Sequence, residues 1–143
     1  MQNVKTVGIT PPAAIIDNAA AVTATVDTKG FSKARFMVYL GALDIAMTAF
    51  KLQQSDDSGM SGAADVSGAD FSVSPLTLPG ASDDNHFFAI YVDLRGKKRY
   101  MDLSLTLGDG AAGSFITAWV DLYGAAEVPD TAAERGLTQQ AIV

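Results

Sequence analysis

Apolar and polar residues alternate along most of Phe87–Tyr123, FFAIYVDLRGKKRYMDLSLTLGDGAAGSFITAWVDLY, and this pattern is the strongest structural signal in the chain. A period of two is typical of a β-strand, whose successive side chains point to opposite faces of a sheet. Two turns, Arg95–Lys98 and Gly108–Gly113, divide the stretch into three strands, which we expect to form an antiparallel meander. Its core face would hold Phe88, Ile90, Val92, Leu94, Met101, Leu103, Leu105, Leu107, Ile116, Ala118, Val120 and Leu122.

The same alternation predicts three further strands earlier in the chain, over Ala20–Asp27, Ser32–Leu40 and Ala46–Gln54. The first would place Val22, Ala24 and Val26 on one face, and the second would place Ala34, Phe36, Val38 and Leu40 on one face. A Gly-bearing turn, Asp27–Gly30, favours a hairpin between these two strands.

Residues 58–85 are rich in Ser, Gly, Ala and Asp and contain only short apolar pieces. We expect short edge strands at Phe71–Val73 and Leu76–Leu78 within a long surface loop. The chain of 143 residues is therefore predicted to be one all-β domain of about eight strands, an antiparallel β-sandwich or jelly-roll-like barrel. The sandwich would span 20–123, between an N-terminal arm (1–19) and a C-terminal arm (124–143) that lack the alternation.

The composition argues against most enzyme classes. The chain has no Cys and a single His, His86, so we expect neither a thiolate nucleophile nor a metal centre built from Cys or His. Ten basic against sixteen acidic residues give a net charge of −6, which repels phosphate backbones and argues against nucleic acid as a partner. We expect a protein without catalytic residues, cofactors or bound metal.

The apolar runs are too short for a membrane span, which needs about 18 consecutive apolar residues. Met1–Thr6 lacks the basic and apolar regions of a secretory signal, so we expect synthesis in the cytoplasm, no Sec export and no membrane partner. The chain is nevertheless apolar, with 48% hydrophobic and 18% charged residues. This balance indicates that part of its apolar surface is buried against other subunits.

Two pairs of acids, Asp56-Asp57 and Asp83-Asp84, are candidates for acid–base or calcium chemistry. Both lie in Ser- and Gly-rich turns, where Asp is common because its side chain bonds nearby backbone, so we interpret them as ordinary turns. A weak calcium site between loops and a small hydrolase remain the alternatives. His86 lies at the start of the Phe87 strand, and the chain has no second His and no Cys that could act with it in catalysis. We interpret it as a residue that forms local hydrogen bonds.

The face of the meander opposite the core is less polar than a solvent face should be. Aromatic residues of this kind favour the core of a protein interface, although a carbohydrate-binding platform would show them too. The candidate residues for packing between subunits are Tyr91, Tyr100, Phe115, Trp119 and Tyr123, and Phe87 shares their phase. We expect Trp119, the only Trp, to be buried between subunits.

Four of the ten basic residues gather in one turn of this acidic chain: Arg95, Lys97, Lys98 and Arg99. Such a cluster could dock on an anionic surface, either another protein or phosphate. The competing interpretation is a solvated turn that keeps the end of a hairpin soluble.

Several short segments resemble small structural proteins encoded beside the major capsid protein in tailed bacteriophages. They are Asp27–Phe31 (DTKGF), Leu52–Asp57 (LQQSDD), Gly68–Phe71 (GADF) and above all Val92–Tyr100 (VDLRGKKRY). The resemblance implies a head decoration or cement protein with no catalytic residues, assembling as a homotrimer on the outer surface of the virion. Its partners would be the major capsid protein and other copies of itself. The residues that would contact the capsid or another subunit are Arg95, Lys97, Lys98 and Arg99. The alternative is a carbohydrate-binding β-sandwich of a phage tail or adhesin.

Overall fold

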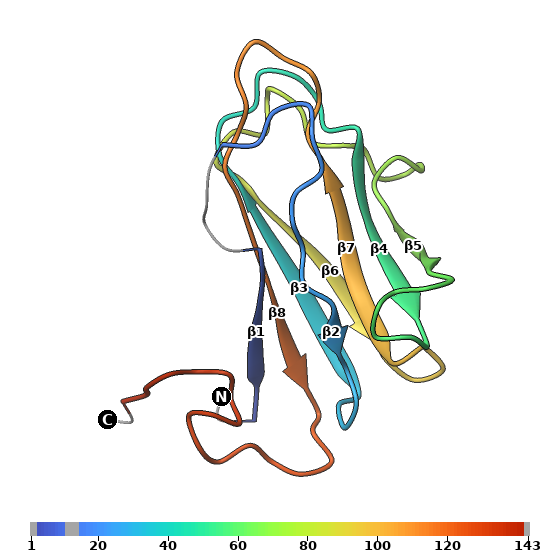
Figure 1. Cartoon of the computed structure of the whole chain (residues 1–143), viewed down its shortest axis with the longest axis vertical. Helices are drawn as coiled ribbons and strands as arrows, with labels where there is room; N and C mark the ends of the chain where they lie inside the picture. Colours follow the sequence, from blue (N-terminus) through green and yellow to red (C-terminus); the bar gives the residue numbers. More distant parts are fainter. Residues whose placement is uncertain (1–2, 11–14, 142–143) are drawn as a thin grey trace.

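Eight strands form two antiparallel sheets in the computed structural model, which describes residues 3–10 and 15–141 (Figure 1). The strands are β1 (Lys5–Thr10), β2 (Val26–Asp27), β3 (Lys33–Leu40), β4 (Ala49–Ser55), β5 (Ala64–Asp70), β6 (Phe87–Asp93), β7 (Tyr100–Thr106) and β8 (Ile116–Tyr123). The first sheet has the order β1-β8-β3-β6, and the second has the order β2-β7-β4-β5. The sheets pack face to face, which confirms the predicted all-β sandwich, but they do not close into a barrel.

The core lies between the two sheets and is built by the alternating side chains. Eleven of the twelve core residues predicted over 87–123 are buried, and Phe88 is partly buried against them. The predicted inner residues of β3 are all buried as well. At the centre, the Phe50 ring is fully buried, stacks on Phe71 at 4.1 Å between centroids and meets Phe88 edge-on at 5.8 Å.

The expected meander over 87–123 is wrong, although its strands and their inner faces are right. β6 and β8 lie in the first sheet on either side of β3, while β7 lies in the second sheet. The two connections therefore cross from one sheet to the other instead of closing hairpins. The alternation cannot distinguish these arrangements, because a strand buries the same face whether its neighbour in sequence lies beside it or across the core.

The predicted strand over Ala20–Asp27 and its hairpin with β3 are also wrong. Only Val26–Asp27 form a strand, and it pairs with β7 in the second sheet. The backbone N–H of Ala21 donates to the Leu105 carbonyl oxygen of that sheet (2.9 Å), whereas that of Ala24 donates to the Ile9 carbonyl oxygen of the first (3.0 Å). A segment that changes partners between sheets cannot keep a regular ladder, and Val22 is left 80% exposed.

The short edge strands expected at Phe71–Val73 and Leu76–Leu78 do not form. The edge of the second sheet is instead β5, which the sequence pattern missed because only Val66 and Ala69 of its residues are buried hydrophobics. Their spacing departs from a period of two where the pairing of β4 with β5 shifts register and Gly68 has a φ of +80°. A β-bulge of this kind hides a strand from an analysis of alternation.

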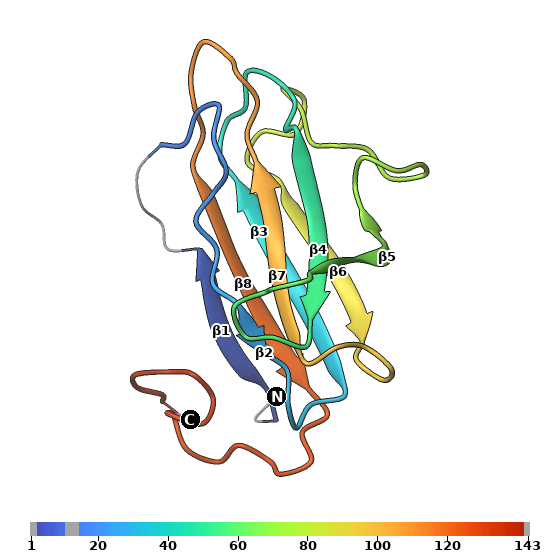
Figure 2. The same cartoon turned by 45° about the vertical axis from the view of Figure 1, so that its right-hand side comes forward.

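The two terminal segments are held against the sandwich rather than extending freely from it. Residues 5–10 of the expected N-terminal arm form β1, whereas residues 1–2 and 11–14 of that arm lie outside the described residues. The C-terminal segment curves around the lower end of β1 (Figure 2), where the Arg135 carbonyl oxygen accepts a hydrogen bond from the Thr6 N–H (2.9 Å). Reciprocal hydrogen bonds between Thr131 and Glu134 form a capping box that shapes the turn before Arg135.

Replacing Phe50 with Ala should lower the free energy of unfolding by about 3–5 kcal/mol, because a fully buried aromatic ring leaves a cavity when it is removed. Urea-induced unfolding followed by Trp119 fluorescence measures this change. The control is Val22→Ala, which truncates an exposed apolar residue and should change stability by less than about 0.5 kcal/mol. Equal effects of the two substitutions would contradict the assigned core.

Candidate docking surface

The outer face of the first sheet carries a row of aromatic side chains from three neighbouring strands. Tyr39 of β3 lies opposite Phe87 of β6, and the two rings stack at 4.4 Å between centroids with 27° between their planes. Trp119 of β8 meets Phe87 edge-on at 6.3 Å. Together with Tyr91 of β6 and Tyr123 of β8, these residues make up what we call the aromatic face: Tyr39, Phe87, Tyr91, Trp119 and Tyr123.

The aromatic face is open to solvent along β6. Phe87 is 61% exposed and Tyr91 is 76% exposed, whereas Tyr39 and Trp119 are half-buried by their neighbours. Exposed large apolar residues that cluster on one face are typical of interaction sites in soluble proteins. The stacking of Tyr39, Phe87 and Trp119 on one another restricts their rotation, so less side-chain entropy would be lost when a partner binds.

A polar network fixes the lower part of the same face. Asp121 of β8 is buried and accepts hydrogen bonds from the Thr6 hydroxyl (2.8 Å) and from Nη2 of Arg35 (2.7 Å). The bond to Asp121 raises the pKa of Arg35, and the guanidinium lies 5.9 Å from the centroid of the Tyr123 ring. Asp121 therefore links β1, β8 and β3 and holds a cation among the aromatic side chains.

A shallow hollow of about 230 Å³ lies beside this network, between Tyr91 and Tyr123. Burial raises the pKa of Tyr123, and the nearby Asp121 carboxylate adds to this shift. A phenol is protonated at neutral pH and can donate a hydrogen bond. Two aromatic walls with charged groups between them could accept a small polar ligand such as a sugar. The hollow is lined by Lys33, Ala34, Tyr91, Val92, Asp93 and Tyr123.

The structure brings together most of the aromatic residues singled out from sequence. Tyr91, Trp119 and Tyr123 lie on the aromatic face, and Phe115 precedes β8 in the same phase and is 54% exposed. Tyr100 does not join them, because it begins β7 in the other sheet, where the Arg99 guanidinium lies 4.9 Å from its ring centroid. The outer residues of β3 also lie on this side of the sheet and were not among the candidates from sequence, although the same alternation points them outward: Arg35, Met37 and Tyr39.

The basic turn 95–99 is largely neutralised by aspartates of the same chain. Arg95 pairs with Asp93 through two guanidinium nitrogens, and Arg99 pairs with both carboxylate oxygens of Asp27 (2.8 and 2.6 Å). Nζ of Lys98 lies 3.3 Å from an oxygen of Asp56. Lys97 is exposed and has no ion pair within the described part of the chain.

The acid pairs mainly support loops. Asp83 accepts from the Gly80 N–H (2.8 Å), Asp84 from the Leu43 N–H (2.7 Å) and Asp57 from the Gly59 N–H (2.8 Å). His86 is exposed, and its carbonyl oxygen accepts a hydrogen bond from the Leu40 N–H. Among residues 3–10 and 15–141, no three His, Asp or Glu side chains are placed to hold a metal ion.

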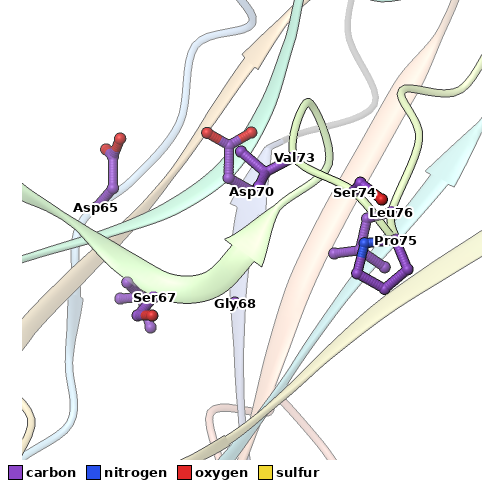
Figure 3. Close-up of a pocket in the computed structure, with 9 residues that line it drawn as sticks. Asp65, Ser67, Gly68, Asp70, Val73, Ser74, Pro75 and Leu76 are labelled. Atoms are coloured by element: carbon purple, nitrogen blue, oxygen red, sulfur yellow. The ribbon is translucent and has the colours of Figure 1, made fainter.

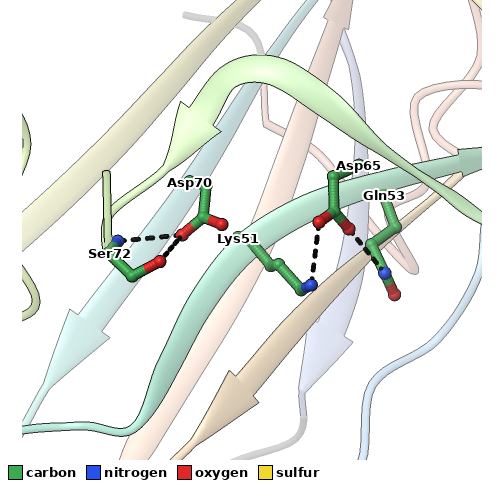
Figure 4. Close-up of polar contacts among 5 residues, drawn as sticks. All are labelled: Lys51, Gln53, Asp65, Asp70 and Ser72. Atoms are coloured by element: carbon green, nitrogen blue, oxygen red, sulfur yellow. Dashed lines mark hydrogen bonds and ion pairs between the residues drawn. The ribbon is translucent and has the colours of Figure 1, made fainter. Parts of the chain in front are cut away.

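A hollow of about 480 Å³ follows β5 and is bordered by the loop Ser74–Leu76 (Figure 3). Two of its carboxylates already have partners, as Figure 4 shows. Asp65 bonds Lys51 (2.9 Å) and Gln53 (2.8 Å), and Asp70 bonds the backbone and hydroxyl of Ser72 (2.8 and 2.6 Å). These contacts lower the pKa of both carboxyls. They also hold β5 and the turn after it at the edge of the second sheet.

Neither the models of known protein families nor the curated proteins contain a match to this chain. No helix that could cross a membrane occurs in the described ranges.

Replacing Asp27 with Asn should destabilise the protein at pH 7 by less than about 1 kcal/mol, because the ion pair with Arg99 is partly exposed. The hydrogen bond from Arg99 lowers the pKa of Asp27 from 3.8 to about 2. A carboxyl whose pKa is depressed on folding stabilises the fold above its unfolded pKa and loses this effect as pH falls through the folded value. The difference from the wild type should therefore vanish between pH 3.8 and about 2.

Urea unfolding at a series of pH values measures this dependence. Asp109→Asn is the control, since Asp109 is exposed in a loop, and it should change stability at pH 7 by less than about 0.5 kcal/mol. A deficit of Asp27→Asn that is unchanged at pH 2 would contradict the role of the charge.

Proposed function

We propose that the protein is a non-enzymatic structural protein that attaches through its aromatic face to a larger protein assembly, and that this assembly is the outer capsid of a tailed bacteriophage. The observation that carries the proposal is the aromatic face itself, with Phe87 and Tyr91 exposed on a rigid sheet. Aromatic residues and Arg are enriched in the central, fully buried parts of protein interfaces. The resemblance of Val92–Tyr100 to phage head proteins supports the capsid as the partner.

The arrangement of charges supports a structural role. Arg35 is already paired with Asp121, so its positive charge can be buried at an interface with part of its hydrogen bonding satisfied. The carboxylates that suggested acid–base or calcium chemistry are largely engaged in turns and ion pairs. Such groups stabilise loops and the ends of strands.

Tyr91→Ala should weaken binding to capsids at least about tenfold, which corresponds to about 1.4 kcal/mol, because truncation of an exposed aromatic anchor removes contact area. Co-sedimentation with tailed-phage capsids that lack the protein measures binding. Emission of Trp119, the only Trp in the chain, should shift to the blue as the face becomes buried. Val22→Ala is the control, because Val22 is equally apolar and exposed but lies outside the aromatic face.

Failure of the wild-type protein to bind capsids at any salt concentration would contradict the capsid as partner. The hollow between Tyr91 and Tyr123 favours one second candidate, a carbohydrate-binding module. Binding to a glycan array that is lost in Tyr91→Ala, without capsid binding, would favour that candidate.

A further inference from the structure

The four edge strands of the sandwich differ in how they are protected from pairing with another chain. β1 has an irregular register at Gly8–Thr10 and donates a hydrogen bond to the C-terminal segment through Thr6. β2 is only two residues long, and β5 has a register shift and a glycine at positive φ. Short strands, bulges and covering segments are the usual means by which proteins block an exposed edge.

β6 has none of these protections. It is seven residues long and pairs with β3 without a shift of register, and it contains neither Lys, Gly nor Pro. No ladder joins β6 to β5 of the second sheet, and a hollow of about 330 Å³ lies between residues 66–69 of β5 and residues 90–93 of β6. β6 is thus the one long, regular edge without such protection among the strands that the structure describes.

The hydrogen-bonding pattern shows which backbone groups of β6 are free. Leu94 donates to Ser32 and His86 accepts from Leu40, so the even-numbered residues between them bond to β3. Bonding alternates along an antiparallel strand, and the N–H and C=O groups of the odd-numbered residues therefore point away from the sheet. These residues are Phe87, Ala89, Tyr91 and Asp93.

We infer that two copies of this chain pair through β6 as antiparallel strands about a two-fold axis at Ile90, which joins their first sheets into one continuous eight-stranded sheet. In this register Ala89 lies opposite Tyr91 of the second copy, and Phe87 lies opposite Asp93 of the second copy. All four positions present outward backbone groups, so each pair can exchange two hydrogen bonds. Because the side chain of Ala89 is small, the Tyr91 ring of the second copy has room to pack over it.

The charges beyond the two ends of β6 complement this antiparallel arrangement. The acidic loop with Asp83 and Asp84 precedes the strand, and the basic turn with Arg95 and Lys97 follows it. Antiparallel pairing about Ile90 brings the basic turn of one copy to the same end of the joint as the acidic loop of the other, so Lys97 and Asp83 of the second copy carry opposite charges at that end. Lys97 is the cation of this turn that has no ion pair within the described chain, and both acids serve only as acceptors of backbone hydrogen bonds there.

The inference does not depend on the proposed function, because it follows from the edge and not from the identity of the partner. Pairing through β6 would place the aromatic faces of two copies side by side and so double the surface available for attachment. It differs from the homotrimer implied by the resemblance, since a two-fold contact of one edge with itself closes after two copies.

The first test is the mass of the full chain in solution, by light scattering over a range of concentrations. We expect twice the monomer mass of 14.9 kDa at high concentration. Ala89→Pro should shift the protein to the monomer, because it removes an outward N–H that β3 does not use. A wild-type monomer or trimer, or a folded Ala89→Pro variant that remains dimeric, would overturn the inference.

The second test needs no change to the strand and remains valid if Ala89→Pro fails to fold. Lys97→Glu should weaken self-association at least tenfold at low salt, whereas Lys5→Glu makes the same charge change on β1, at the other edge of the same sheet, and should not. Amide hydrogen exchange of the wild type at Phe87, Ala89 and Tyr91 should slow as concentration rises. Equal effects of the two charge reversals, or exchange that is independent of concentration, would contradict pairing through β6.

Discussion

The strict alternation of side chains along β3 couples the core of the sandwich to its outer aromatic face. The strand lies between β8 and β6, so its backbone is hydrogen-bonded on both sides. Its inner residues, with Phe36 at 0% exposure, pack against the second sheet, and its outer residues, with Tyr39 and Arg35, form the floor of the aromatic face. A shift of one residue would exchange these two sets, which couples the core to the docking surface.

Electrostatics organise the two ends of the sandwich differently. At the lower end the basic turn is held by aspartates, of which Asp27 belongs to β2 and Asp93 to β6. At the upper end Asp83 and Asp84 accept backbone hydrogen bonds, with no Lys or Arg in the surrounding described loops. The excess negative charge of the chain therefore lies mainly in the upper loops. The positive charge of the basic turn is largely balanced by its aspartate partners.

The candidate site could be predicted from the sequence only in part. The phase of the alternation correctly placed Tyr91, Trp119 and Tyr123 away from the core, because all three lie in regular strands of one sheet. It misplaced Tyr100, since phase alone does not say which sheet a strand joins. The ion pairs of the basic turn were also beyond prediction, because Arg99 and Asp27 are 72 residues apart and meet only through the pairing of β2 with β7.

Local alternation and turn residues such as Gly30 predict the all-β class, the positions of most strands and the buried side of each strand. They do not predict which strands share a sheet, that residues 20–27 cross between sheets, or that β5 is an edge. These features depend on hydrogen bonds between distant segments, for example Ala24 with Ile9, and a pattern along the chain does not record which distant partner a backbone group will find. The unprotected edge of β6 is likewise a property of the pairing, since a strand becomes an edge only when the other strands have taken their places.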